Sequence, residues 1–302
     1  MNWYKIAIEG REVPITSEEF GAMTWREKRA LARKTSLTPE VQLLFFTEEY
    51  AEKSEVLQAL AWSENIHPEV QRLFFTEEYE YKALHNLAVN PSITLETQRL
   101  FFAWNYWNKS HFLWNLAKNR SITPEVQRLF LTEEYKNKGS VLQNLAWNPS
   151  ITLEIQRLFF TEEYKGEALK GLARNTSITP EIQRLFFTEE YEGKMEALRW
   201  LAQNRSIHPA TQLLFFTSRY ESKGRVLWDL AQNSSITPEI QRLLITEEYE
   251  DKGLALWILA KNENFLRGDF TRDELLQIKK VARGGAKLLV LSKRLKQIAG
   301  VP

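Results

Sequence analysis

The sequence of 302 residues predicts an all-α fold, a right-handed α-solenoid of about eight two-helix repeats with a capping helix at each end. Two observations predict this fold. Around each of eight glutamines the same order of apolar and polar residues returns, and self-similarity at a period of about 20 to 50 residues is typical of stacked repeats. The glutamines recur 27 or 29 residues apart and are Gln42, Gln71, Gln98, Gln127, Gln156, Gln183, Gln212 and Gln241.

The first helix of each repeat is predicted to begin at a threonine, as in Thr123-Pro124-Glu125. Threonine caps free backbone amides, proline fits the first helical position, and glutamate suits the positive helix N-terminus. Apolar residues such as Ile155 and Leu158 follow at helical spacing. Repeat length changes by two residues after the Thr-Glu-Glu-Tyr motif. Within one continuous helix, two extra residues would rotate all later side chains by roughly 200° about the helix axis, so the helix must break there.

The second helix is shorter and is predicted to bury apolar doublets such as Leu145-Ala146. Asparagine then closes it in nearly every repeat. We interpret this asparagine as a turn residue that bonds nearby backbone rather than as a ligand-binding residue. We interpret the glutamine as scaffold, with side-chain amides that bond between stacked repeats. The closing asparagines are Asn90, Asn119, Asn148, Asn175, Asn204, Asn233 and Asn262.

Charged residues also repeat in the first helix. Glutamate and arginine stand three apart, as in Glu69 and Arg72, and are expected to form solvated surface pairs within each helix. The Thr-Glu-Glu-Tyr motif leaves two alternatives open. Because glutamates late in a helix oppose its dipole, either a new helical turn begins at the threonine or the acidic ridge serves another purpose.

The pattern Leu-Ala-x-Asn-Pro-Ser-Ile-Thr-x-Glu resembles the variant leucine-rich repeat family over roughly residues 25–264. The resemblance implies a HEAT-like superhelix of paired short helices and implies no particular activity. This chain has longer units than that family. It also lacks the cysteine cluster of some members, which excludes an iron–sulfur role.

Both ends depart from the repeat, as solenoid ends must to cover an apolar face. We predict an N-terminal segment over 1–24, the repeat array over 25–264 and a basic helical cap over 265–302. Thr24 with Glu27 and Thr271 with Glu274 have the spacing of capping boxes. The cap has a formal charge of +6, and residues 36–264 have a formal charge of −7.

Composition excludes several classes of protein. Lys and Arg total 40 against 39 Asp and Glu, so net charge indicates neither a nucleic-acid binder nor a membrane-surface protein. The absence of cysteine excludes disulfides and thiol catalysis and suits a reducing compartment, and the sequence shows no signal peptide or membrane span, so we expect a cytoplasmic protein. No metal site, cofactor or nucleotide motif is expected.

The positions that vary inside the repeat are the candidate site. They are the two residues before the Leu-Ala pair of the second helix and the one after it, which lie opposite the buried doublets. We expect them to line the concave surface, although the tryptophans could simply fill gaps between repeats. The predicted ligand-binding residues are Trp62, Trp114, Lys118, Trp147, Lys170, Arg174, Arg199, Trp200, Trp228, Asp229, Trp257 and Lys261.

Three functions are compatible with this strip. Interleaved Trp, Lys and Arg favour an extended nucleic acid by a narrow margin, because these side chains stack on bases and pair with phosphates. The same residues are typical of protein interfaces, which makes a protein- or peptide-binding scaffold the alternative. Asp229, the one acid of the strip, is a candidate catalytic residue by analogy with helical-repeat DNA glycosylases. We expect a non-enzymatic protein.

Overall fold

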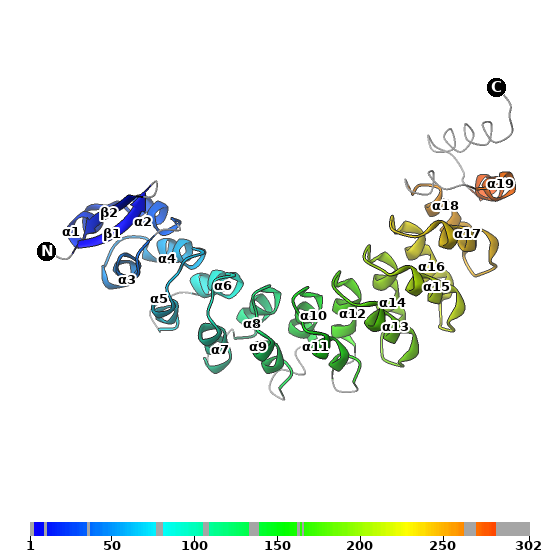
Figure 1. The fold of residues 1–302 in the computed structure, drawn as a ribbon, viewed down its shortest axis with the longest axis horizontal. Coiled ribbons are helices and arrows are strands. Elements are labelled where there is room, and N and C mark those ends of the chain that lie inside the picture. Colours follow the sequence, from blue (N-terminus) through cyan, green and yellow to red (C-terminus); the bar gives the residue numbers. More distant parts are fainter. Residues whose placement is uncertain are drawn as a thin grey trace, which may run out of the picture. The chain divides into compact units, whose positions relative to one another are not determined.

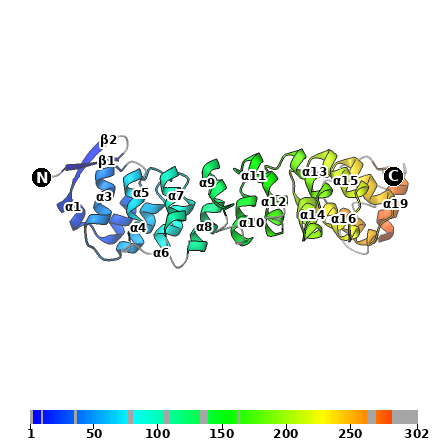
Figure 2. The ribbon, with the colours of Figure 1, turned by 90° about the horizontal axis from the view of Figure 1, so that it is seen from below.

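The computed structural model describes residues 3–8, 11–34, 37–76, 81–104, 109–132, 139–161, 164, 166–262 and 270–281. The described part is helical apart from one two-stranded hairpin, and each helix packs on its neighbours in sequence (Figures 1 and 2). The predicted helical tandem-repeat architecture is therefore confirmed. Two compact units, Met1–Ile151 and Thr152–Pro302, divide the molecule, and each is described by itself.

In the first unit, successive second helices pack side by side in one row and successive first helices in another. The first helices are α3, α5, α7 and α9, and the second helices are α4, α6, α8 and α10. The bounds are β1 (Trp3–Ile8), β2 (Arg11–Thr16), α1 (Ser17–Ala22), α2 (Trp25–Ala32), α3 (Pro39–Thr47), α4 (Lys53–Ala61), α5 (Pro68–Leu73), α6 (Tyr81–Val89), α7 (Leu95–Ala103), α8 (Lys109–Lys118), α9 (Pro124–Leu129) and α10 (Gly139–Trp147).

The second unit repeats this arrangement. Its second helices α12, α14, α16 and α18 form one row, and α13, α15 and α17 pack beside one another in the other. The bounds are α11 (Leu153–Leu158), α12 (Glu167–Arg174), α13 (Pro180–Thr188), α14 (Lys194–Gln203), α15 (Pro209–Thr217), α16 (Lys223–Gln232), α17 (Pro238–Thr246), α18 (Lys252–Leu259) and α19 (Arg272–Val281).

The N-terminal hairpin is the departure from the predicted all-α fold. β1 pairs with β2 in antiparallel register, from Trp3 opposite Thr16 to Ile8 opposite Arg11. Both segments are rich in β-branched and aromatic residues, which favour strands over helices. A capping box of Thr16 and Glu19 then begins α1.

The predicted caps of the repeat array are present. Thr24 and Glu27 form a capping box at the start of α2. At α19, the amide of Glu274 donates to the hydroxyl of Thr271, and the amide of Thr271 donates to the carboxylate of Glu274. The rest of the predicted basic cap, apart from 270–281, lies outside the described residues.

The core lies between the two rows of each unit. The Leu-Ala doublets of the second helices, such as Leu201 and Ala202, are fully buried, as are first-helix phenylalanines such as Phe186. Phenylalanines of successive repeats meet edge-to-face, for example Phe160 and Phe186 at 5.0 Å between ring centroids. Each repeat therefore buries its apolar surface against the next one.

The closing asparagines have a larger role than the predicted turn. The side-chain oxygen of Asn204 accepts from the amide of Ser206, which is the local bond expected of a turn residue. Its amide nitrogen donates to the carbonyls of Ala173 and Asn175, both in the preceding repeat. The same three bonds recur at Asn90, Asn119 and Asn148. These asparagines connect successive repeats through buried amides.

The glutamines connect repeats as predicted. The amide of Gln183 donates to the carbonyl of Ile178 in its own repeat and to that of Ser206 in the next. Its oxygen accepts from the amide of His208, at the start of the next first helix. The pattern recurs at Gln42, Gln71, Gln98 and Gln212.

The predicted pairing of glutamate and arginine within one helix was wrong. Arg72 pairs with Glu96 of the next repeat rather than with Glu69, and Arg157 pairs with Glu181 of the next repeat at 2.6 Å. Arg99 and Glu125 form the same kind of pair. Successive first helices lie side by side, so the neighbouring repeat offers a closer carboxylate than the helix itself. The pairs are about half exposed, as expected.

The Thr-Glu-Glu-Tyr motif lies at a helix end. In α13 the helix ends at Thr188 and Glu189 is its C-cap, so no new helical turn begins at the threonine and the glutamates lie beside the negative end of the helix dipole. The Tyr191 hydroxyl donates to the carbonyl of Phe186, and Lys194 donates to that of Phe187 and pairs with Glu190 at 2.8 Å. Burial raises the pKa of the Tyr191 hydroxyl. The motif therefore satisfies helix C-terminal carbonyls, as cations and donors do elsewhere.

Within the described ranges, no helix is both apolar enough and long enough for a bilayer crossing. The same residues contain no group of three or more His, Asp and Glu side chains placed to hold a metal ion.

Candidate ligand-binding face of the second helices

The predicted strip divides into three columns along each row of second helices. The first column contains the first residue of each pair before Leu-Ala, the inner column the second, and the end column the residue after Leu-Ala. Most of the inner column is buried, whereas the other two columns are half-buried or exposed. The inner column is Ala59, Asn86, Asn115, Asn144, Gly171, Trp200, Asp229 and Ile258.

Inner-column side chains bond within and between second helices. The amide of Asn86 donates to the carbonyl of Gln58 in the preceding repeat. The amide of Asn115 lies 2.9 Å from Nδ1 of His85, also in the preceding repeat. Helical spacing alone predicts that these residues face the ligand. In the structure they contact the preceding repeat instead.

Asp229 is the clearest case of this burial, with a side chain 0% exposed. Its Oδ2 accepts from Nε of Arg199 at 2.6 Å, and its Oδ1 accepts from the amide of Gln203. Both oxygens are therefore engaged by side chains of α14. A general base must reach the proton it removes, and among the described residues the Asp229 oxygens bond to these two side chains.

Three tryptophans of the strip lie beneath the protein's own cations. Lys118 Nζ lies 3.0 Å from the ring centroid of Trp114, and Lys261 lies 3.0 Å from that of Trp257. In each pair the lysine follows the tryptophan by one helical turn, which brings the two side chains onto one face. Between repeats, the Arg174 guanidinium lies 4.2 Å from the ring centroid of Trp200. Such cation–π contacts fix both partners.

The first unit also contains a stack of aromatic rings. His85 stacks on His111 at 5.2 Å, and His111 stacks on Trp114 at 5.9 Å. Lys118 therefore adds a cation to a column of three rings from α6 and α8. Burial first, and then the nearby His111 and Lys118, lower the pKa of His85 because all three disfavour its charged form.

Trp62 and Trp147 differ from these tryptophans because they belong to the end column. Their exposed fractions are 54% and 48%, the two largest among the exposed tryptophans of the described residues. Trp62 ends α4 and Trp147 ends α10, both in the first unit. They supply the large apolar surface that an interface needs.

The positive charge of the strip is partly offset by acids, two of which, Glu167 and Glu196, lie outside the predicted strip. Lys170 pairs with Glu167 at 2.6 Å and with Glu196 at 2.8 Å. The hydrogen bonds that Lys170 donates to Glu167 and then to Glu196 raise its pKa. Arg199 pairs with Asp229. The predicted cations Lys170 and Arg199 therefore have carboxylate partners.

Glu167 and Glu196 belong to a leading row, one helical turn before the first column. The leading-row residue of one repeat lies against the first-column residue of the preceding repeat, as Glu196 does against Lys170 and His111 against His85. The spacing i−3 would have found this row in the sequence, because residues three apart share a helix face. The leading row is Glu55, Lys82, His111, Ser140, Glu167, Glu196, Arg225 and Leu254.

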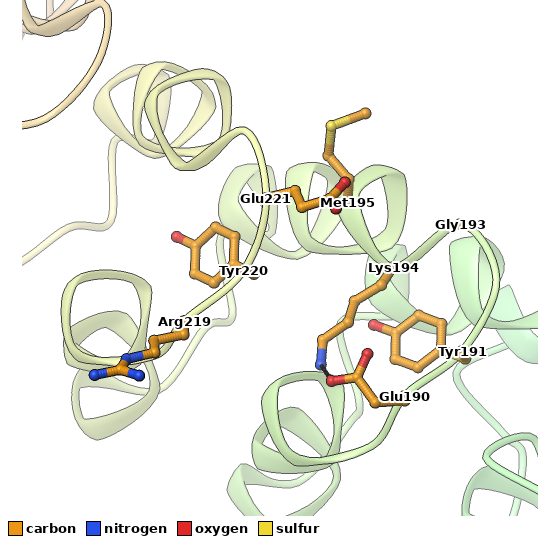
Figure 3. Close-up of a pocket in the computed structure, with 8 residues that line it drawn as sticks. All are labelled: Glu190, Tyr191, Gly193, Lys194, Met195, Arg219, Tyr220 and Glu221. Carbon is orange, nitrogen blue, oxygen red and sulfur yellow. Dashed lines mark hydrogen bonds and ion pairs between the residues drawn. The ribbon is translucent and has the colours of Figure 1, made fainter.

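Two hollows in the second unit could receive ligand groups. The larger, of about 670 Å³, lies between the loops after α13 and α15 (Figure 3). Most of its polar groups already have partners: Lys194 pairs with Glu190, and the hydroxyls of Tyr191 and Tyr220 donate to first-helix carbonyls. Among the described residues, the Arg219 guanidinium is the lining group that is left to donate to a ligand.

The smaller hollow, of about 370 Å³, belongs to the second-helix face. Arg199 of α14, Arg225 and Trp228 of α16, and Asp251 and Leu254 at the start of α18 form its walls. It therefore combines strip residues with the leading row.

Comparison of the sequence and fold with protein-family models, with curated proteins and with solved structures finds no match.

Proposed function

We propose that this protein is a non-enzymatic binding scaffold whose second-helix face holds an extended segment of another protein. The observation that supports this most is the exposure of Trp62 and Trp147 on the end column of the first unit. Tryptophan and arginine dominate the binding energy of protein interfaces, where their large side chains fill pockets in the partner. Arg174, also exposed in the end column, adds the second residue type of that kind.

The distribution of charge favours a protein ligand over the nucleic acid expected from sequence. Single-strand binders combine a basic groove with aromatic faces open to bases. Here Trp114, Trp200 and Trp257 are covered by cations of the protein itself, and Glu167, Glu196 and Asp229 offset part of the positive charge. A protein segment can use tryptophan edges and mixed charges, whereas a polyanion is repelled by those acids.

Nucleic acid is the second candidate because Lys118, Arg174 and Lys261 present positive charge beside aromatic rings. That candidate predicts binding that weakens steeply with salt, since each phosphate contact releases counterions. A DNA glycosylase role gains no support from the buried, fully paired carboxylate of Asp229.

The proposal includes a right-handed superhelix of about eight repeats, like that of the variant leucine-rich repeat family, with the second helices on its concave side. The closer packing among second helices than among first helices within each unit supports it. An array curves toward its more closely packed row, and concave solenoid surfaces commonly hold extended ligands. A cytoplasmic location is part of the proposal and is supported by the lack of cysteine.

Peptide selection on the full-length protein tests the proposal. Peptides selected from a random library should bind at least tenfold more weakly to the double variant Trp62→Ala/Trp147→Ala, because each truncation removes a large buried contact. Leu213→Ala is the matched control, since Leu213 is an exposed apolar residue on the first helix α15. Equal loss of peptide binding in the double variant and in Leu213→Ala, or no loss in either, would refute the second-helix face as the binding surface.

A short fluorescent oligothymidylate, measured over about 50 to 500 mM salt, tests the second candidate. Weak binding that the double variant leaves unchanged is expected. Tight, salt-steep binding that the double variant abolishes would replace the protein ligand with nucleic acid.

A further inference from the structure

The 370 Å³ hollow breaks the charge pattern of its row. One repeat earlier, first-column Lys170 pairs with leading-row Glu196 at 2.8 Å. In the next repeat the equivalent positions are Arg199 and Arg225, so an arginine replaces the glutamate. Two guanidinium groups therefore line one hollow where the preceding pair is a salt bridge.

Arg199 is held in a fixed orientation. Asp229, which is 0% exposed, accepts from its Nε at 2.6 Å, while the Arg199 side chain is 36% exposed. The carboxylate uses the Nε side of the guanidinium, which leaves the terminal nitrogens for other acceptors. A buried group that orients a binding side chain is the arrangement that precise recognition requires.

The other walls complete a mixed pocket. Arg225 is exposed, and its guanidinium has no ion pair or hydrogen bond among the described residues. The indole Nε1 of Trp228 is buried and has no hydrogen-bond partner in the part of the protein that the structure describes. Leu254 is 48% exposed and adds apolar surface beside the Trp228 ring. Asp251 supplies an acceptor at the rim.

We propose that this hollow binds a carboxylate of the ligand segment, a proposal that rests on the proposed function of the second-helix face. The planar guanidinium fork of an arginine matches a carboxylate with two parallel hydrogen bonds. Leu254 and Trp228 accommodate the apolar stem of the ligand residue, and Asp251 accepts an amide N–H of its backbone. The Asp251 carboxylate also disfavours a phosphate dianion, which carries more negative charge.

The carboxylate has two sources, the C-terminus of a polypeptide or an acidic side group, and small probes distinguish them. N-acetylphenylalanine presents a terminal carboxylate, and the α-amide of N-acetylglutamic acid presents a side-group carboxylate. The matched neutral probes are N-acetylphenylalaninamide and the α-amide of N-acetylglutamine. Binding to the full-length protein is followed through the indole N–H resonance of Trp228, which the variant Trp228→Phe assigns.

At least one carboxylate probe should shift this resonance, and its neutral counterpart should bind about tenfold more weakly, as expected for a charge-assisted pair. Arg225→Gln should weaken the carboxylate probe by about tenfold and leave folding intact, because Arg225 is exposed and unpaired among the described residues. Arg225→Glu, which recreates the Lys–Glu pattern of the preceding repeat, should abolish binding. Arg205→Gln is the control, since Arg205 is exposed in the turn after α14.

Equal binding of acids and amides, or unchanged binding to Arg225→Gln, would overturn the carboxylate site. The probes act in the second unit and do not involve Trp62 or Trp147. Failure of the peptide experiment with successful probe binding would therefore refute the extended protein ligand alone. Peptide binding that depends on the two tryptophans, without probe binding, would refute the carboxylate pocket alone.

Discussion

At the scale of single residues, the closing asparagine joins two repeats through one buried amide. Asn204 donates to the carbonyls of Ala173 and Asn175, each at 2.9 Å, and accepts from the amide of Ser206. Removing the side chain would take this partner from two buried carbonyls and from the part-buried amide of Ser206. An unsatisfied buried polar group costs more free energy than a hydrogen bond contributes on balance. The closing asparagine is therefore the position of the repeat where substitution should destabilise the fold most.

We predict that Asn204→Ala lowers the free energy of unfolding by about 2 to 4 kcal/mol, the sum expected for several buried groups left unpaired. Denaturant unfolding followed by circular dichroism measures the loss. Gln232→Ala, at an exposed end-column position of the same unit, should change stability by less than about 0.5 kcal/mol. A similar change in both variants would show that the amide network contributes little.

His85 provides a second residue-scale prediction, in its response to pH. Burial, His111 and Lys118 lower its pKa in the folded protein, so the unfolded protein binds its proton more readily. The stability from neutral His85 is present above the unfolded pKa of about 6.5 and is lost as pH falls below it. Between about pH 7.5 and 5, the free energy of unfolding should therefore fall less in His85→Gln than in the wild type.

The control for His85 is His208→Gln, an exposed position at the start of α15. It should keep the acid sensitivity of the wild type. Identical pH profiles for wild type and His85→Gln would show that the ring stack does not couple protonation to folding.

At the scale of helices, the sequence predicted the positions of the second helices and failed to predict which side chains they hide. The buried Leu-Ala doublets and the closing asparagines define the register, because the doublets recur in every repeat and the asparagines in nearly every repeat. The inner column was placed on the ligand face because helical spacing describes one helix at a time. Asp229 is buried by Arg199 and Gln203 of the preceding second helix, a contact that only the packing of α14 against α16 creates.

The same limitation affected the charges. The sequence predicts Lys170 to be a ligand-binding cation, because that prediction considers the three columns of the strip and not the residues one helical turn earlier. Glu196 of the next second helix pairs with Lys170, and Glu96 of the next first helix pairs with Arg72. The sequence contained the residues of both pairs, whereas the partner of each was set by which helices lie side by side.

The Asp229–Arg199 pair gives the prediction at this scale. Asp229→Ala leaves the guanidinium without its buried partner, and the partial exposure of Arg199 allows water to replace some of the loss. We expect a cost of about 1 to 3 kcal/mol, toward the low end for a broken buried pair. Replacing both partners in Arg199→Met/Asp229→Leu should recover most of it, since apolar packing often equals a buried ion pair.

Denaturant unfolding of the single and double variants measures that recovery. A double variant as unstable as Asp229→Ala would show that the ion pair itself, and not the relief of an unpaired charge, joins α14 to α16.

At the scale of the whole molecule, stability is expected to follow contacts between neighbouring repeats, as in other repeat proteins. Three kinds of contact recur between repeats: buried apolar doublets, buried Asn and Gln amides, and exposed Arg–Glu pairs. The first two kinds are shielded from solvent. The third is about half exposed at Arg72, Arg99 and Arg157, where water and salt screen it.

We therefore predict that the triple variant Arg72→Gln/Arg99→Gln/Arg157→Gln loses less stability than the single variant Asn204→Ala. Exposed ion pairs contribute about 0 to 1 kcal/mol each, and a screened pair lies near the lower limit. The wild type should also change little between about 50 and 500 mM salt. Denaturant unfolding of both variants over that range measures this. If the triple variant were the less stable one and its loss vanished in salt, surface charge rather than the buried amides would hold the repeats in register.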